Sequence, residues 1–146
     1  MRRAVASPAL SPLSYLAFDF GMRRVGVASG NSLTGTATPL TTIASQGEAR
    51  LAAIESLVAE WSPAALVVGV PFHPDGAAHV NTARARRFAR ELRGRFGLTV
   101  HEVDERYTTT AAKSTGSADL DAAAAAIILE QFLASAAAPG DAEGGR

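Results

Sequence analysis

The sequence contains no cysteine, which excludes disulfide bonds and thiolate metal sites and is consistent with a reducing compartment such as the cytoplasm. It also lacks net charge: 14 Lys and Arg residues balance 14 Asp and Glu residues, so no overall basic field attracts nucleic acid. No apolar run reaches the length of a membrane span, and no membrane partner is expected. Function must therefore be sought in local groups of charge.

The length of 146 residues and the hydrophobic fraction of 47% suit one globular domain, which we expect to cover residues 15–135. Residues 1–14 begin with two arginines and are interrupted by Pro8 and Pro12, which predicts a flexible N-terminal arm rather than a signal peptide. Residues 136–146 are small, polar and rich in glycine, which predicts a disordered tail.

Hydrophobic patterning predicts an α/β fold with the element order β-β-β-α-β-α-β-α. Strands are expected at Tyr15–Phe20, Val25–Ser29, Thr34–Ile43, Ala65–Val70 and Thr99–Val103, and helices at Glu48–Glu60, Val80–Phe96 and Asp119–Ala134. The first three strands predict an antiparallel meander. Right-handed crossovers then place the fourth strand beside the first, in a five-stranded mixed sheet with helices on its faces.

One carboxylate, Asp19, stands inside the first apolar run, YLAFDF. Burial of an ionised carboxylate is unfavourable unless the group is paired, hydrogen-bonded or bound to a metal. Asp104 and Glu105 follow the last predicted strand, and Asp119 and Asp121 begin the final helix. If the first strand is central, these acids converge at one edge of the sheet, where their oxygens suit Mg²⁺ or Mn²⁺. Two such ions can activate water for phosphodiester cleavage.

Simpler roles remain open for the acids outside the first strand. Asp104 and Glu105 could pair with Arg106 at a solvated strand end. Asp119 and Asp121 could cap the final helix and interact favourably with its dipole. Spacing along the chain does not decide between these roles and a shared metal site.

Besides Arg2 and Arg3 in the N-terminal arm, arginines gather at two places in the sequence. Arg23 and Arg24 follow the first strand, in a predicted turn. The helix expected at Val80–Phe96 carries six more, namely Arg84, Arg86, Arg87, Arg90, Arg93 and Arg95. A charged helix surface is usually a solvated face, but this arrangement also suits contact with a nucleic-acid backbone. Both interpretations remain open at this point.

Five segments of the chain resemble, in order, the motifs of the YqgF family, also called RuvX. They are YLAFDFGMRRVGVASGNSLTGTATPL, ALVVGVPFHPDG, ARARRFARELRGRFGLTV, VDERYTTTAA and DAAAAAIILEQFL. The resemblance extends from Tyr15 to Ser135. Members of this family have an RNase H-like fold and are proposed nucleases of precursor 16S rRNA, earlier described as Holliday junction resolvases. The resemblance implies the same fold here, with the first strand central and the fourth parallel to it.

The resemblance also implies roles for individual residues. Asp19, Glu105 and Asp121 match the catalytic acids, and together with Asp104 they are the candidate ligands of two Mg²⁺ or Mn²⁺ ions. The implied partner is RNA, namely precursor 16S rRNA, free or within the pre-ribosome. Contact with the nucleic-acid backbone is expected from Arg23, Arg24, Arg84, Arg87, Arg90, Arg106, Thr108 and Thr109.

The chain departs from the family between DER and the final helix, where YTTTAAKSTGSADL replaces a longer and more basic segment. This departure keeps a non-catalytic nucleic-acid-binding module as an alternative function. A Holliday junction resolvase acting on branched DNA is another alternative, but it requires a dimer, and no dimerisation surface is evident, so a monomer is favoured. An actin-like ATPase shares the turn DFGMRRVGVA but requires two such domains, and the chain has room for one.

Overall fold

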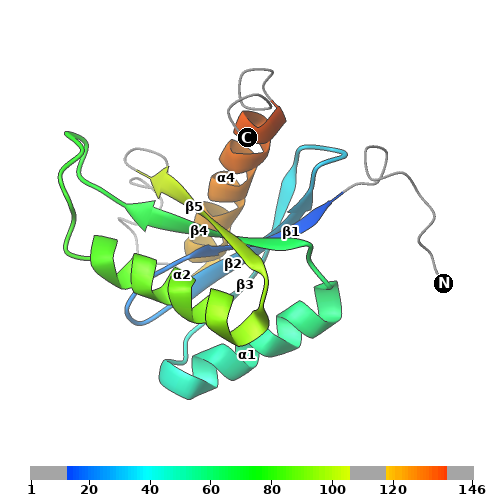
Figure 1. Cartoon of the computed structure of the whole chain (residues 1–146), viewed down its shortest axis with the longest axis horizontal. Coiled ribbons are helices and arrows are strands. Elements are labelled where there is room, and N and C mark those ends of the chain that lie inside the picture. Colours follow the sequence, from blue (N-terminus) through cyan, green and yellow to red (C-terminus); the bar gives the residue numbers. More distant parts are fainter. Residues whose placement is uncertain (1–12, 106–117, 138–146) are drawn as a thin grey trace.

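The computed structural model describes residues 13–105 and 118–137. Its elements follow the predicted order (Figure 1): β1 Ser14–Asp19, β2 Val25–Asn31, β3 Ala37–Ile43, α1 Gly47–Trp61, β4 Ala65–Pro71, α2 Thr82–Phe96, β5 Thr99–Glu105 and α4 Ala118–Ala137. The arm expected before Leu13 and the tail expected after Ala137 lie outside the described residues. No helix within the two described ranges is both long and apolar enough to cross a membrane.

The strands form one mixed sheet in the order β3-β2-β1-β4-β5. β1 pairs antiparallel with β2, and β2 with β3, whereas β4 pairs parallel with both β1 and β5. The predicted position of the fourth strand beside the first is therefore confirmed. Because helices cover both faces of the sheet, β1 and β4 are buried almost throughout, which explains their continuous apolar sequences.

Helices α1 and α2 cover one face of the sheet and α4 covers the other (Figure 1). The larger part of the core lies on the α1/α2 face, where Leu16 and Phe18 of β1 pack with Phe88 and Leu92 of α2. The rings of Phe18 and Phe88 meet edge to face with their centroids 6.0 Å apart. On the α4 face, Tyr15 packs edge to face against a ring of α4.

The third strand begins later than predicted, at Ala37 instead of Thr34. The preceding residues form a turn because the Asn31 side chain takes over their backbone hydrogen bonds. Asn31 Oδ1 accepts hydrogen bonds from the backbone nitrogens of Leu33, at 2.9 Å, and Thr34, at 3.0 Å. Local side-chain bonding of this kind competes with pairing in a strand.

The second helix and the last strand also differ from the prediction. α2 begins at Thr82 instead of Val80, because the buried Thr82 hydroxyl donates a hydrogen bond to the Pro71 carbonyl oxygen. The same hydroxyl accepts a hydrogen bond from the His79 backbone nitrogen at 2.8 Å. β5 runs two residues beyond its predicted end and includes Glu105, which therefore has a fixed strand conformation.

Candidate active site

The candidate site lies where the central strand ends. Side chains alternate along β1, so Phe18 joins the core on the α1/α2 face and Asp19 points to the α4 face. Asp19 is 3% exposed. Its partners in register are Gly26 of β2 and Gly69 of β4. The neighbouring positions on both adjacent strands therefore carry no side chain, and this allows groups from other elements to lie close to the carboxylate.

The space over Gly69 is occupied by the Glu105 side chain. A Cβ atom at Gly69 would lie 3.0 Å from Glu105 Oε2 and 2.5 Å from Ile128 Cδ1. Glu105 ends β5 and is 5% exposed. Because glycine within a strand permits such a close approach, Gly69 makes room for a second buried carboxylate next to Asp19.

The space over Gly26 is occupied by the backbone of α4. A Cβ atom at Gly26 would lie 1.8 Å from the Asp121 carbonyl oxygen, so the helix rests directly on β2. This contact places Asp121 on the side of Asp19 opposite to Glu105. The Asp121 carboxylate pairs with Arg24, whose Nε lies 2.8 Å from Asp121 Oδ2.

The structure thus gathers three of the predicted acids at one edge of the α4 face. One oxygen of each is shielded from solvent, namely Asp19 Oδ1, Glu105 Oε2 and Asp121 Oδ2. The donors are carboxylate oxygens, which suit Mg²⁺ and Mn²⁺, and the glycines allow Glu105 and the start of α4 to lie close to Asp19. As placed, however, the His, Cys, Asp and Glu side chains of the described residues form no group of three that could hold a metal ion. Asp121 is paired with Arg24 instead, through its Oδ2 oxygen.

Asp104 lies apart from these three acids. Along β5, Glu102 faces α2, since its Oε2 lies 3.1 Å from Arg93 Nη2, and alternation puts Asp104 on that same side. Asp104 is exposed. We therefore leave Asp104 out of the candidate ligands and keep Glu105.

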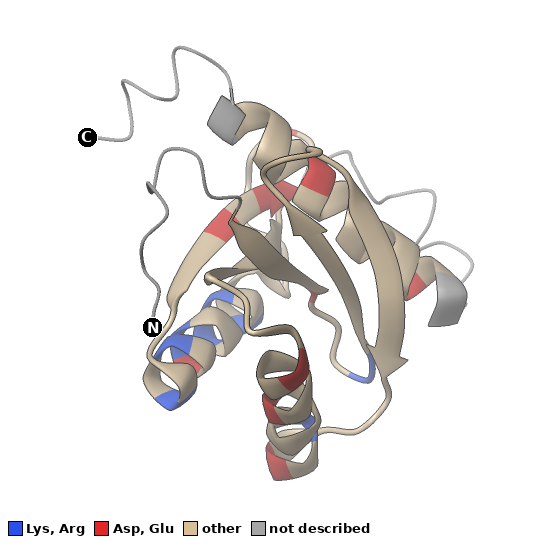
Figure 2. Cartoon of the chain, turned by 90° about the vertical axis from the view of Figure 1, so that its right-hand side faces the viewer, with Lys and Arg blue, Asp and Glu red and all other residues tan. Residues whose placement is uncertain are grey.

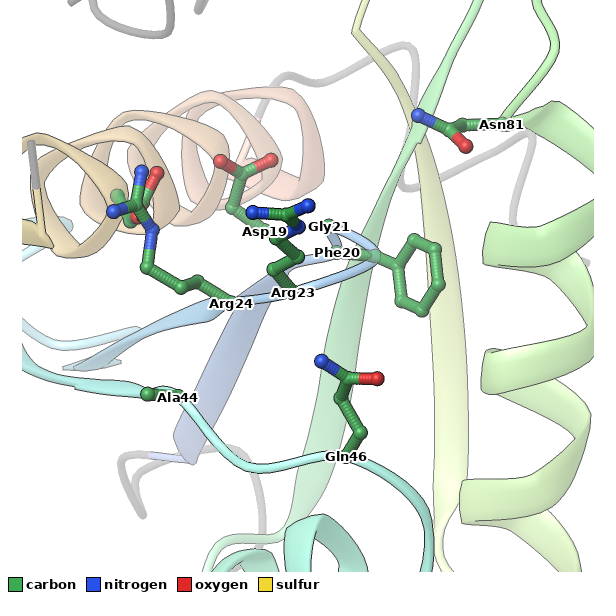
Figure 3. Close-up of a pocket in the computed structure, with 9 residues that line it drawn as sticks. Asp19, Phe20, Gly21, Arg23, Arg24, Ala44, Gln46 and Asn81 are labelled. Carbon is green, nitrogen blue, oxygen red and sulfur yellow. The ribbon is translucent and has the colours of Figure 1, made fainter. Parts of the chain in front are cut away.

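A cavity of about 570 Å³ opens beside the acids (Figure 3). Its polar lining combines both charges and two amides: Asp19, Asp121, Arg23, Arg24, Gln46 and Asn81. In Figure 3 the Arg24 side chain extends from the turn after β1 towards α4, and the Asp19 carboxylate points to the same side. Negative groups for a cation and positive groups for a phosphate therefore line one cavity. Gln46 and Asn81 were not predicted from the sequence.

The turn between β1 and β2 is held in place by Arg50, a residue of α1 that the sequence analysis did not single out. Arg50 is buried and donates hydrogen bonds to the Met22 carbonyl oxygen, at 3.1 Å, and the Ser45 carbonyl oxygen, at 2.9 Å. Its guanidinium carbon lies 5.6 Å from the ring centroid of Phe20. Burial lowers the pKa of Arg50, and the charge of Glu91 opposes this shift.

Half of the arginines of α2 have a structural role. They pair with acids of α1 or β5, namely Arg95 with Glu48 and Glu55, and Arg86 and Arg93 with Glu102. Figure 2 shows this charge distribution, with basic residues gathered on α2 and acidic residues along α1. For these three arginines the structure favours ion pairs within the protein over contact with nucleic acid.

The other arginines of α2 are those predicted to contact nucleic acid. Arg84, Arg87 and Arg90 are exposed, and Arg87 has only a long ion pair to Glu91, at 3.8 Å. Arg84 and Arg87 line a second cavity of about 450 Å³, which shares Phe20 with the first. Three further predicted contacts lie outside the described residues: Arg106, Thr108 and Thr109.

Comparisons with known proteins agree with the resemblance seen in the sequence. The profile of the RuvX family, described as a Holliday junction resolvase, matches residues 13–135. The chain belongs to the RuvX family. A Polaromonas protein named "Putative pre-16S rRNA nuclease" is 66% identical over 122 residues, which are 84% of this chain and 88% of that protein. A Paraburkholderia phytofirmans protein of the same name is 53% identical over 133 residues, covering 86% of this chain and 91% of that protein.

A solved structure confirms the fold class. The chain is similar to T. thermophilus RuvC, solved in complex with a Holliday junction substrate, with a TM-score of 0.51 and 15% sequence identity. The match covers 83% of this chain and 93% of that chain. At this identity the likeness concerns the fold alone, and the fold is RNase H-like, as the resemblance implied.

Proposed function

We propose that this chain is a divalent-metal-dependent endonuclease that cleaves phosphodiester bonds in structured RNA, and that its substrate is the 5′ region of precursor 16S rRNA. Membership of the RuvX family and the names of its relatives support a nuclease. The observation that carries the proposal is the placement of Asp19 and Glu105, both buried, beside Gly69, with Asp121 on the other side of Asp19.

In this proposal, Asp19, Glu105 and Asp121 hold Mg²⁺ or Mn²⁺, and two ions are expected. When bound, such ions lower the pKa of water and stabilise charge on the leaving oxygen. The protein contributes rigid placement, because Asp19 lies on the central strand and Glu105 on the edge strand of the same sheet. Burial of both carboxylates also strengthens their attraction for a cation, since the surroundings are less polar than water.

The substrate backbone is proposed to enter the cavity beside the acids. Arg23 and Arg24 provide positive charge for a phosphate there, and Asn81 provides amide hydrogen-bond donors. The second cavity, which is also lined by Phe20, brings Arg84 of α2 to the same side of the molecule as a further positive charge. Contacts of this kind position a backbone without reading its sequence, so the shape of the RNA would determine where it is cut.

Cleavage of branched DNA is a second candidate, because the matching family is described as a Holliday junction resolvase. A resolvase needs two sites facing a four-way junction and therefore a dimer. For RNA processing one copy suffices, since the three acids and the arginines of the proposed site come from a single chain. We favour the monomeric RNA nuclease, acting in the cytoplasm on free or pre-ribosomal RNA.

The test is cleavage of a labelled precursor 16S rRNA 5′ leader, with a four-way DNA junction as a parallel substrate. Wild-type protein should cleave the RNA with Mn²⁺ and not with EDTA. Asp19→Asn and Glu105→Gln should each lower the rate by about 100-fold or more, the scale of losing one charge-stabilising group. Asp104→Asn is the matched control: it removes a neighbouring acid from the opposite side of β5 and should cleave at the wild-type rate.

Three results would contradict the proposal. If folded wild-type protein cleaves neither substrate under any condition, the chain is a non-catalytic binding module. If only the DNA junction is cut, the second candidate replaces the first. If Asp19→Asn fails to fold, as judged by circular dichroism, Asp19 has a structural role and the assignment of the site is wrong.

A further inference from the structure

A positive side chain already occupies part of the candidate metal site. Arg24 Nε lies 2.8 Å from Asp121 Oδ2, in a pair whose side chains are 38% and 14% exposed. Both residues line the cavity that also contains Asp19 (Figure 3). The guanidinium group is thus the nearest ion-pair partner of one candidate ligand, at a place where three carboxylates gather.

This ion pair and a bound metal ion exclude one another in part. Gathered carboxylates need a compensating positive charge, and in the structure Arg24 supplies it to Asp121. The oxygen that Arg24 contacts is the shielded Oδ2 of Asp121. A divalent cation bound by Asp121 takes over the compensation, so the attraction that holds Arg24 on this carboxylate weakens.

We propose that Arg24 holds Asp121 in the metal-free protein and moves to a substrate phosphate when divalent ions bind, so that metal binding and phosphate binding favour one another. This inference rests on the proposed function, because it uses the same three acids. It gives Arg24 a positioning role beyond the general backbone contact expected of a basic residue. Arg24 therefore links two ligands that occupy adjacent parts of one cavity.

The chemistry of arginine suits binding to Asp121 and binding to a phosphate. A guanidinium group forms directed hydrogen bonds with a carboxylate and with a phosphate, and it remains charged in either place. The side chain is partly exposed towards the cavity, so it can turn from one partner to the other without unfolding of the turn. That turn is anchored independently, since Arg50 holds the Met22 carbonyl oxygen.

Thermodynamic linkage fixes the sign of the expected effects. In this proposal metal binding competes with the Arg24–Asp121 pair of the wild-type protein, so removal of Arg24 should strengthen metal binding in the absence of substrate. A phosphate that accepts Arg24 should likewise strengthen metal binding, and the metal should strengthen phosphate binding by the same factor. Without Arg24 this mutual factor should be smaller, because only the direct attraction between metal and phosphate remains.

The experiment is a calorimetric titration of Mn²⁺ into the full chain, with and without a phosphorothioate-linked RNA oligonucleotide that resists hydrolysis. Arg24→Gln is compared with wild type and with Arg23→Gln. Arg23→Gln is the control, because it removes one positive charge from the same cavity and leaves the Arg24–Asp121 pair in place. It therefore measures how much the loss of a positive charge alone changes the Mn²⁺ affinity. We expect Arg24→Gln to bind Mn²⁺ about fivefold more tightly than wild type, and more tightly than Arg23→Gln.

The oligonucleotide should raise the Mn²⁺ affinity of wild type by about fivefold or more and that of Arg24→Gln by a smaller factor. The inference would be overturned if wild type and Arg24→Gln bound Mn²⁺ with equal affinity. It would also be overturned if Arg23→Gln increased the Mn²⁺ affinity as much as Arg24→Gln does. Neither result would contradict the metal site itself. If wild-type protein binds no Mn²⁺, the metal site of the proposed function fails as well. If Arg24→Gln does not fold, Arg24→Lys replaces it in the experiment, because lysine keeps the positive charge but lacks the planar guanidinium group. In Arg24→Lys the oligonucleotide should raise the Mn²⁺ affinity by a smaller factor than in wild type.

Discussion

The two faces of the central sheet are packed in different ways. On the α1/α2 face, large side chains such as Phe18, Phe88 and Leu92 fill the space between sheet and helices. On the α4 face near the end of β1, Gly26 and Gly69 leave the strands without side chains, and helix backbone and carboxylates take their place. The α1/α2 face is thus packed with large apolar side chains that stabilise the fold. The α4 face near the end of β1 has less side-chain packing and contains buried carboxylates instead. Adding or deleting methyl groups on each face tests this difference.

Deletion of a large side chain from the α1/α2 face should have the largest effect on stability. Leu92 is fully buried, so Leu92→Ala should lower the free energy of unfolding by about 2–5 kcal/mol, through lost burial and the cavity that remains. Chemical denaturation measures the loss. The folded fraction should bind Mn²⁺ with wild-type affinity, and a large fall in that affinity would show that the two faces do not have separate roles.

Addition of one methyl group to the α4 face should have the next largest effect. In Gly26→Ala the new Cβ would lie 1.8 Å from the Asp121 carbonyl oxygen, so α4 must shift. We expect a loss of about 1–3 kcal/mol in the free energy of unfolding, together with weaker Mn²⁺ binding.

A matched control for the methyl group exists on α2. A Cβ at Gly94 would meet nothing within 4 Å, and alanine is the better helix former, so Gly94→Ala should stabilise the protein by up to about 1 kcal/mol. If Gly26→Ala were as stable as wild type, the close packing of α4 on β2 would be contradicted.

A methyl group at Gly69 should affect binding more than stability. Its nearest neighbours would be the Ile128 and Glu105 side chains, at 2.5 Å and 3.0 Å, and side chains yield more easily than the helix backbone at Gly26. Gly69→Ala should therefore cost only about 1 kcal/mol while displacing the Glu105 carboxylate. A Mn²⁺ titration should show weaker binding. Wild-type affinity in this variant would argue against Glu105 as a ligand.

The smallest predicted effect is a pH dependence at His101. The ring packs against Phe132 of α4, with centroids 4.7 Å apart, and burial followed by the charge of Arg93 lowers the pKa of His101. The unfolded chain then binds a proton more readily than the folded chain, so stability should fall as the pH drops below about 6.5. His101→Phe should remove this contribution to the pH dependence of stability. Parallel denaturation curves near pH 7.5 and 5.5 test it; equal pH dependence in both proteins would contradict it.

Most of the fold could be predicted from the sequence, because apolar runs and right-handed crossovers determine the order of the strands. The start of β3 could not, since it depends on the hydrogen bonds of the Asn31 side chain. The role of Arg50 was also hidden, because a buried arginine has the same sequence pattern as a solvated one. Its partners, such as the Met22 carbonyl oxygen, lie far from it along the chain.

For the site, the sequence indicated which acids are candidate ligands but not how they are placed. The choice between Asp104 and Glu105 depends on which residues of β5 face α4, and residue types alone do not determine that register. A signal was available at Gly26 and Gly69, because glycine within a buried strand often marks a close approach. The Arg24–Asp121 pair could not be foreseen, since it depends on where α4 rests on β2.

The most direct test of the central claim is a crystal structure of the protein grown with Mn²⁺, with the ions located by their anomalous scattering. We predict Mn²⁺ bound to carboxylate oxygens of Asp19, Glu105 and Asp121, with the Arg24 side chain withdrawn from Asp121. Absence of anomalous density at these acids in crystals that contain Mn²⁺, or density only elsewhere on the protein, would contradict the claim that they form a metal site.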